Sequence, residues 1–190
     1  MAKRILLLAS GTGSLAAAIL AAHEAGDIAL EIVGLLSDKD CPALQVASNH
    51  GVPIFYIPMP KPPAPRAQWD EEILKATEDL NPDLVVSVGF MRILAPKYVE
   101  RFQVINTHPS LLPAFPGAHA VRDALLAGVQ ITGTTVHRVD AGLDTGPVIS
   151  QVEVPVMQTD DESTLHERIK IAERALIVET LAKYGETGNL

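Results

Sequence analysis

The sequence predicts an α/β protein with a doubly wound, mostly parallel twisted sheet of the Rossmann-like kind, then a C-terminal antiparallel strand pair and a long final helix. Two observations carry this prediction. Short apolar segments without internal alternation are each followed by a helix-like segment, which is typical of a parallel sheet covered by helices on both faces. The last two strand-like segments instead follow each other with only a loop between them.

Each predicted strand is a run of aliphatic residues too short for a buried helix. Strands and helices alternate in the order 4–9, 14–26, 30–37, 41–51, 53–58, 68–80, 83–89, 95–102, 104–108 and 120–128. The proline-rich stretch 58–68 is predicted to be a surface loop. The C-terminal strand pair is expected at 131–139 and 147–156, and the final helix at about 160–184.

The final helix carries an apolar and a polar stripe. Thr159 with Glu162 predicts a capping box at its start. The apolar stripe, which is expected to be buried, consists of Leu165, Ile169, Ala172 and Leu176. A second stripe, expected to be solvated unless a ligand site lies against it, consists of His166, Lys170 and Glu173.

Composition and charge narrow the class of protein. A chain of 190 residues is expected to form a single domain over 1–190. The formal net charge of −8 argues against a nucleic-acid partner.

Serine and glycine interrupt the apolar N-terminus early, unlike in a signal peptide, and no run approaches the ~20 apolar residues of a membrane span. The single cysteine, Cys41, indicates a reducing, cytoplasmic location, and we expect a buried or half-buried side chain.

A strand, a glycine-rich turn and a helix follow one another in LLLASGTGSLAAA. Free backbone N–H groups at a helix start bind anions, so this turn is a candidate anion site. Gly11, Gly13 and Ala16 also satisfy the relaxed G-x-G-x-x-A pattern, and Asp38 ends the next strand, so a dinucleotide site is a rival interpretation. A tight turn that needs small residues only for packing is the third.

The segment GFMRILAPKYV, residues 89–99, is unusually apolar for a loop that follows a strand. Ligands of open α/β sheets bind at the C-terminal ends of the strands. The side chains that are candidates for the wall of an apolar pocket are Phe90, Met91, Ile93 and Leu94. Taken alone, the segment is explained better as a cover over the core.

Asn106 and His108 stand at the end of a predicted strand, in VINTHPSLLP. Residues i and i+2 of a strand point to one face, and Pro109 favours an extended backbone at His108. An amide donor beside an imidazole can stabilise an oxyanion and move a proton. The pair is therefore a candidate catalytic site.

The loop in HRVDAGLDTGPVI, residues 137–149, offers Asp144 as an aspartate that could pair with His108. Aspartate and glycine are also standard turn residues, so this segment by itself supports both readings. His137, inside the preceding strand, is expected to be a buried core or supporting histidine. No metal site is predicted, because histidine and cysteine show no ligand spacing.

Four segments together resemble the phosphoribosylglycinamide formyltransferase family, in order and over essentially the whole chain: ASGTGS, SVGFMRILAP, INTHPSLLPAFPG and GTTVHRVDAGLDTGPVI. The N-x-H-P-S-L-L-P segment is shared with other formyl-folate enzymes, whereas SGTGS and the short chain indicate this branch. The resemblance implies a formyltransferase-type fold. It also implies transfer of the formyl group of 10-formyltetrahydrofolate to the amine of glycinamide ribonucleotide in purine biosynthesis. Small-molecule substrates and no metal are implied as well, and a homodimer is left open.

The resemblance further implies a role for each matching residue. The catalytic set would be Asn106, His108 and Asp144, in a folate-binding and catalytic half at about 101–190. The ribonucleotide would be held by a nucleotide-binding half at about 1–100 and by the last helix, through Gly11, Thr12, Gly13, Ser14, Leu15, Lys170 and Glu173. The folate would contact Arg66, Met91, Arg92, Ile93, Leu94 and Asn106.

Two departures from the family pattern accompany these roles. Thr12 and Leu15 stand where many members carry asparagine, which implies one side-chain contact fewer to the ribonucleotide. Position 170 varies in the family.

Other functions stay open. A related enzyme could formylate a different amine, although the acidic charge disfavours methionyl-tRNA, or could hydrolyse 10-formyltetrahydrofolate to formate. A dinucleotide enzyme would use the glycine turn with Asp38 but would leave Asn106, His108 and Asp144 without a role. A non-catalytic nucleotide-binding module would not need His108 at all.

Overall fold

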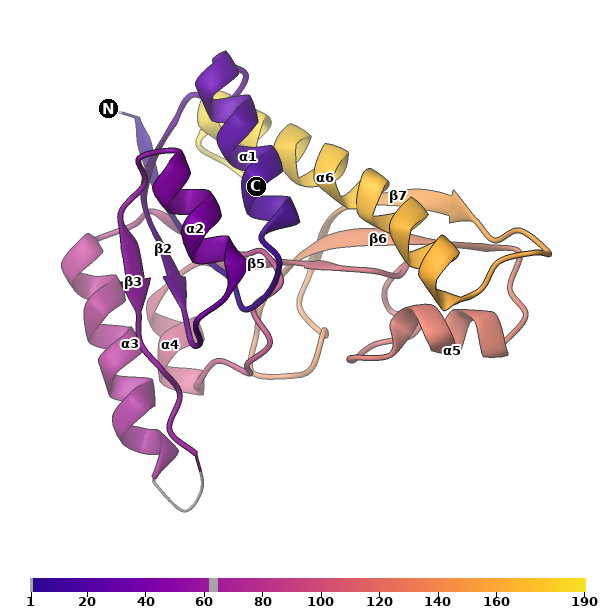
Figure 1. The fold of residues 1–190 in the computed structure, drawn as a ribbon, viewed down its shortest axis with the longest axis horizontal. Coiled ribbons are helices and arrows are strands. Elements are labelled where there is room, and N and C mark those ends of the chain that lie inside the picture. The colour runs from indigo at the N-terminus through magenta and orange to yellow at the C-terminus, as the bar shows by residue number, and fades with distance from the viewer. Residues whose placement is uncertain (1, 62–64) are drawn as a thin grey trace.

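The computed structural model describes residues 2–61 and 65–190, whose strands form one sheet in the order β3-β2-β1-β4-β5-β6-β7 (Figure 1). The parallel strands are β1 (Lys3–Leu8), β2 (Leu30–Ser37), β3 (Ile54–Tyr56), β4 (Leu84–Ser87) and β5 (Val104–His108). The antiparallel strands are β6 (Ile131–Arg138) and β7 (Val148–Pro155). The predicted fold class is confirmed.

Helices cover the sheet on both faces (Figure 1). They are α1 (Ser14–Ala25), α2 (Pro42–Asn49), α3 (Arg66–Leu80), α4 (Pro96–Arg101), α5 (Ala120–Leu126) and α6 (Glu162–Thr187). Alternate residues of β1 show the two faces: Ile5 and Leu7 pack in a core with α1, α2 and α6, whereas Leu6 and Leu8 pack in a second core with α3 and α4. Burial on both faces explains why the parallel strands read as continuous apolar runs.

The strand order reverses between β1 and β4, which places three loop segments together. Leu8 pairs with Ser87, and Ser87 pairs with Asn106, so β1, β4 and β5 end side by side. The glycine turn follows β1, the apolar loop at 89–94 follows β4, and residues 106–108 form the end of β5. A switch point of this kind is where open α/β sheets bind ligands.

The predicted cap of the final helix is wrong. The helix begins at Glu162, and its capping box is formed by Asp161 and Thr164: the Thr164 N–H donates to the Asp161 carboxylate at 2.8 Å, and the Asp161 N–H donates to the Thr164 hydroxyl at 3.0 Å. The adjoining Asp160 carboxylate instead accepts two hydrogen bonds from Arg168, at 2.6 and 2.8 Å, and one from the Met157 N–H at 2.8 Å.

The burial of the α6 stripe and of Cys41 can be compared with the predictions. In the predicted apolar stripe of α6, Leu165, Ile169 and Leu176 are buried, and Ala172 is only half-buried. Cys41 is half-buried, within the range that we expected. Residues 62–64 of the predicted loop 58–68 lie outside the described residues. Among the helices that the structure describes, none has the length and apolar composition needed to cross a membrane.

Candidate active site

The pairing of β5 with β6 sets the geometry of the site. Asn106 lies directly opposite His137 in this antiparallel pair, so both side chains point to the same face of the sheet. His108, two residues after Asn106, points to that face as well. Thr107 points to the opposite face, beneath α6.

His108 has an acceptor next to each ring nitrogen. Its Nε2 lies 2.8 Å from the Phe115 carbonyl oxygen, and its Nδ1 lies 3.4 Å from Oδ2 of Asp144. The ring is buried, with only 4% of the residue exposed. Because both neighbours are acceptors, each ring nitrogen forms its hydrogen bond only when it carries a proton.

Asp144 reaches the histidines because the loop before it is tightly folded. The Asp140 carboxylate accepts hydrogen bonds from the Gly142 N–H at 2.9 Å and from the Thr145 hydroxyl at 2.8 Å. A Cβ atom at Gly146 would overlap the Arg138 carbonyl, so the loop can return to β7 only through glycine. Asp144 itself has a left-handed backbone with φ 55°.

The Asp144 carboxylate is shared by three groups. Oδ2 accepts a hydrogen bond from the Gly117 N–H at 2.8 Å and also faces His108. Oδ1 lies 3.6 Å from Nε2 of His137. The expected proximity of Asp144 and His108 is thus present, and a second histidine faces the same carboxylate.

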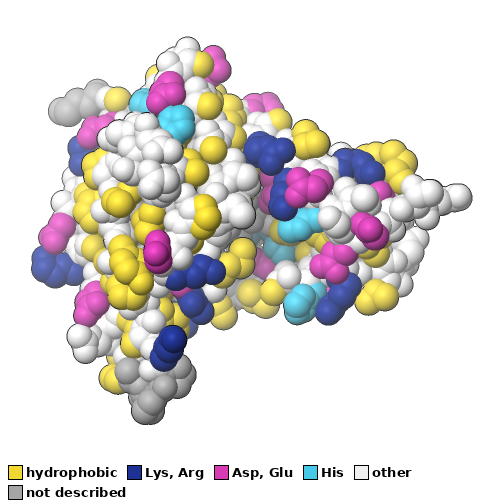
Figure 2. Space-filling view, in the orientation of Figure 1, with side chains coloured by type: hydrophobic (Ala, Val, Ile, Leu, Met, Phe, Trp, Pro, Cys, Tyr) yellow, Lys and Arg dark blue, Asp and Glu magenta, His cyan; other side chains and the backbone are white. Residues whose placement is uncertain are grey.

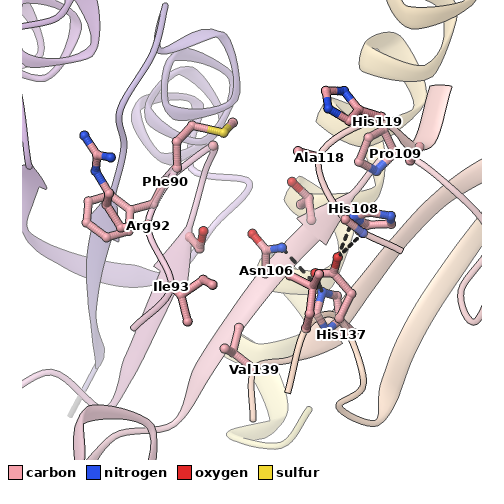
Figure 3. Close-up of a pocket in the computed structure, with 18 of the residues that line it drawn as sticks. Phe90, Arg92, Ile93, Asn106, His108, Pro109, Ala118, His119, His137 and Val139 are labelled. Carbon is pink, nitrogen blue, oxygen red and sulfur yellow. Dashed lines mark hydrogen bonds and ion pairs between the residues drawn. The ribbon is translucent and has the colours of Figure 1, made fainter. Parts of the chain in front are cut away.

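His137 is buried, as predicted, but it also belongs to the candidate site. Burial lowers its pKa, which favours the neutral ring. Its Nδ1–H donates to the Arg138 carbonyl at 2.8 Å, so Nε2 is left to accept from the Asn106 side-chain amide, 3.4 Å away (Figure 3). This role could not be predicted from the sequence, because it depends on the cross-strand register and not on the residues around His137.

A cavity of about 490 Å³ lies over these side chains (Figure 3). One wall holds Asn106, His108, His137 and Asp144, and the other is the loop with Met91, Arg92, Ile93 and Leu94. Figure 2 shows histidine side chains in a hollow of this face, flanked by acidic and basic residues. The structure thus brings together the predicted catalytic candidates and most of the predicted folate contacts.

The side chains of the apolar loop point in two directions, into the core and into the cavity. Phe90 and Leu94 are buried in the core against α3 and α4, as the core-cover interpretation expects. Met91 and Ile93 are 69% and 66% exposed and line the cavity. That interpretation is therefore wrong for these two side chains, since nothing in core packing requires them to point outward.

Several other residues that line the cavity were not predicted from the sequence. His119 precedes α5, His166 lies in the first turns of α6, and Leu143 lies in the loop before Asp144. Burial, helped by Lys170, lowers the pKa of His166. These residues come from distant parts of the chain, and no local pattern links them.

The glycine turn lies beside this cavity and does not line it. Gly13 caps α1 with φ 81°, and a Cβ atom there would lie 2.8 Å from the Ala43 Cα atom of α2. Asp38, the acidic residue of the dinucleotide interpretation, is enclosed and bound to Ser10 and Arg92 at 2.5 and 2.6 Å. A ribose hydroxyl could not reach it without breaking these bonds, so the structure argues against a dinucleotide site.

Glu173 contradicts the expectation of a solvated face on α6. Only 5% of the residue is exposed, because it lies over Thr107 on the back of β5. Burial raises the pKa of Glu173 to about 7, against the lowering effect of Thr107, Lys170 and Arg174. Lys170 itself is more accessible and donates to Glu167 at 2.6 Å.

Arg66 does not line the cavity, but it touches the wall of the cavity from behind. Its guanidinium donates to the Ile93 carbonyl and, at 3.1 Å, to Asp70. Arg66 therefore lies next to the apolar loop, at the first turn of α3.

Comparisons with known proteins identify what this arrangement resembles. A family model described as "Formyl transferase" matches residues 3–181. A phosphoribosylglycinamide formyltransferase from Mycobacterium tuberculosis is 50% identical over 187 residues, which cover 97% of this chain and 86% of the relative.

Solved structures agree with this comparison. The glycinamide ribonucleotide transformylase 1 of Symbiobacterium toebii has a TM-score of 0.92 at 36% identity, covering 97% of this chain and 88% of that one. A formyltetrahydrofolate deformylase from Pseudomonas syringae has the same TM-score at 28% identity, but only 62% of that chain is covered.

Proposed function

The chain belongs to the formyl transferase family, and from this premise we propose that it transfers the formyl group of 10-formyltetrahydrofolate to the amine of glycinamide ribonucleotide. The observation that carries the proposal is the position of Asn106 and His108 on one wall of a cavity whose opposite wall is apolar. The first wall suits a reacting carbonyl and the second suits a flat ring.

In the proposed reaction, the amine nitrogen bonds to the formyl carbon and negative charge develops on the formyl oxygen. The Asn106 amide has one N–H directed at His137 and a second available for this oxygen. The Nε2–H of His108 can join it by exchanging the Phe115 carbonyl for the substrate. Each such donor contributes on the order of 3 kcal/mol to the stability of an oxyanion.

The second half of the reaction breaks the bond between the formyl carbon and N10 of the folate. The proton released by the attacking amine must reach N10, so that tetrahydrofolate leaves as a neutral amine. His108 is the titratable group placed to relay this proton, with Asp144 behind it at 3.4 Å. The attacking amine has to be neutral, and an α-amino pKa of about 8 permits this near neutral pH.

We assign the two substrates to the two sides of the switch point. In this assignment, the ribonucleotide phosphate binds the backbone N–H groups of residues 11–15 at the start of α1, and Lys170 and Glu173 of α6 contact the same substrate. The pterin ring of the folate lies against residues 91–94. Arg66, which holds that loop from behind, is the cation assigned to the acidic tail of the folate.

Hydrolysis of formyl-folate is the second candidate, because a deformylase shares the fold. The identity to the transferase from Mycobacterium is higher, 50% against 28%, and the relative is covered more fully, 86% against 62%. These numbers favour the transferase.

A spectrophotometric assay with purified protein and 10-formyl-5,8-dideazafolate separates the two activities. We expect deformylation only when glycinamide ribonucleotide is present, and a kcat lower on the order of 10²–10⁴-fold in the His108→Ala variant. Formate release without the ribonucleotide would establish the hydrolase. No turnover under either condition would refute both functions.

A further inference from the structure

Asp38 directly follows β2 and connects two segments that are distant in sequence. Its side chain is completely enclosed. Oδ1 accepts a hydrogen bond from the Ser10 hydroxyl at 2.5 Å, and Oδ2 accepts one from Nε of Arg92 at 2.6 Å. Ser10 opens the glycine turn and Arg92 belongs to the apolar loop, so one carboxylate binds both.

Ser10 strengthens this connection through its backbone and its hydroxyl oxygen. The Ser10 N–H donates to the Gly89 carbonyl at 3.0 Å, and the Met91 N–H donates to the Ser10 hydroxyl oxygen at 2.9 Å. Since the hydroxyl proton is donated to Asp38, the oxygen is free to accept from Met91. The three residues therefore form one continuous hydrogen-bond network.

Core packing holds Phe90 and Leu94, and this network positions the residues of the apolar loop between them. The strand β4 ends at Ser87, so residues 89–93 have no ladder of their own. Within the described residues, their hydrogen bonds to other segments lead to Ser10, Asp38 and Arg66. Met91 and Ile93 are largely exposed and cannot be fixed by core packing.

The buried charge makes this connection hard to break. An enclosed carboxylate that loses its cationic partner keeps the cost of desolvation without the compensating attraction. The guanidinium of Arg92 points away from Asn106 and His108 (Figure 3), which leaves the cavity side of the loop to backbone and apolar groups.

We propose that Asp38 is a positioning residue that holds the phosphate-binding turn at 10–15 and the folate wall at 89–94 in a fixed relation, so that both substrates meet at His108. This inference rests on the proposed function. In a dinucleotide enzyme Asp38 would bind a ribose hydroxyl, whereas here it holds two loops in position.

The Asp38→Asn variant tests the proposal with little change in shape. Its single amide oxygen can replace the acceptor for Ser10 or the acceptor for Arg92 but not both, and its NH2 group then faces the other donor. We expect the KM values for 10-formyl-5,8-dideazafolate and for glycinamide ribonucleotide each to rise about tenfold, as a lost charge-assisted hydrogen bond predicts. The fall in kcat should be smaller, because Asn106, His108 and Asp144 stay in place.

Asp160→Asn is the matched control. Asp160 also pairs with an arginine at 2.6 Å and its side chain is only 3% exposed, yet its hydrogen bonds lead to Met157, Thr164 and Arg168 and not to the glycine turn or the apolar loop. This variant should lose thermal stability without a change in either KM. Amide hydrogen exchange in residues 89–93 should accelerate in Asp38→Asn and not in Asp160→Asn.

The possible outcomes separate the two proposals. Inactive wild-type protein would refute the proposed function, whereas exchange at 89–93 would still report whether Asp38 holds the loop. Active wild-type protein with unchanged KM values in Asp38→Asn would overturn the positioning role alone. A rise in only one KM would also overturn it, because Asp38 would then serve one substrate and not both.

Discussion

At the scale of single residues, the two buried histidines of the site share the Asp144 carboxylate and differ in one partner, the Asn106 amide beside His137. His108 faces a carbonyl and a carboxylate, so both of its nitrogens can donate. His137 donates through Nδ1 to a backbone carbonyl and can accept at Nε2 from Asn106, and burial lowers its pKa. One ring is therefore placed to move a proton, while the other orients an amide.

Replacing His108 with alanine should lower kcat on the order of 10²–10⁴-fold, because the loss of a general acid–base group has effects of this size. Folate binding should change little, since the apolar wall stays intact. The measurement is steady-state kinetics with 10-formyl-5,8-dideazafolate and glycinamide ribonucleotide. His50→Ala, at a histidine paired with Glu24 on the surface, is the control. Equal activity of the two variants would remove His108 from the mechanism.

Asp144→Asn should keep the loop and lose the charge. An amide oxygen can still accept from the Gly117 N–H, which lies 2.8 Å from Oδ2. The negative charge shared by His108 and His137 disappears, so we expect kcat to fall on the order of 10²-fold or more through the loss of electrostatic support. Circular dichroism checks that the fold is retained. Full activity in this variant would show that the charge is not needed.

The catalytic candidates could be predicted from sequence because their geometry is local. Asn106 and His108 are two residues apart in a strand, and strand geometry alone puts them on one face. His137 could not be predicted as part of the site, since its position depends on pairing with a strand about 30 residues away. Asp38 was noticed, but its partners Ser10 and Arg92 become visible only in three dimensions.

At the scale of elements, α6 shows how tertiary contacts decide between local signals. The sequence TDDEST contains two overlapping caps, Thr159 with Glu162 and Asp161 with Thr164. Arg168 binds Asp160, and this residue in turn accepts from the Met157 N–H at 2.8 Å. This arrangement favours the later start, and the sequence pattern could not reveal it.

Asp161→Ala should destabilise the protein by about 1 kcal/mol, which is typical for the loss of an N-cap. Thr159→Ala should leave the free energy of unfolding unchanged, because the structure does not place Thr159 at the cap. Urea denaturation of both variants measures the difference. A larger loss in Thr159→Ala would restore the cap that the sequence predicted.

Glu173 makes the stability of the fold depend on pH. Its pKa rises from 4.5 to about 7 on burial. Between these values the folded protein binds more protons than the unfolded chain, so the free energy of unfolding falls as pH rises. The destabilisation is complete above pH 7 and amounts to as much as about 3 kcal/mol.

Glu173→Gln should therefore be more stable than the wild type at pH 8, with little difference at pH 5. Urea denaturation at both pH values measures this change. Glu179→Gln, at an exposed position of the same helix, is the control and should show no such trend. A difference that does not vary with pH would mean that Glu173 is already ionised at pH 5.

At the scale of the whole molecule, the C-terminal ends of β1, β4 and β5 bring together parts of the chain that lie far apart in sequence. The glycine turn follows β1, the apolar loop follows β4, and the strand end carrying Asn106 and His108 belongs to β5. Alternation of strands and helices predicts a parallel sheet, but the order in which the strands lie is not written in any local pattern. The motif loops could be identified from sequence, whereas their meeting point could not.

This arrangement predicts a distinct pattern of protection by each substrate class. Unreactive 5,8-dideazafolate should slow amide hydrogen exchange in residues 89–94 and in 140–144 together, because both segments line the cavity. Inorganic phosphate should slow exchange at 11–15 and leave exchange in 89–94 and 140–144 unchanged, since the glycine turn does not line the cavity. If Asp38 fixes the two regions relative to each other, its replacement by asparagine should weaken both effects. If the folate analogue protected only one of the segments 89–94 and 140–144, the two walls of the cavity would not bind the same ligand.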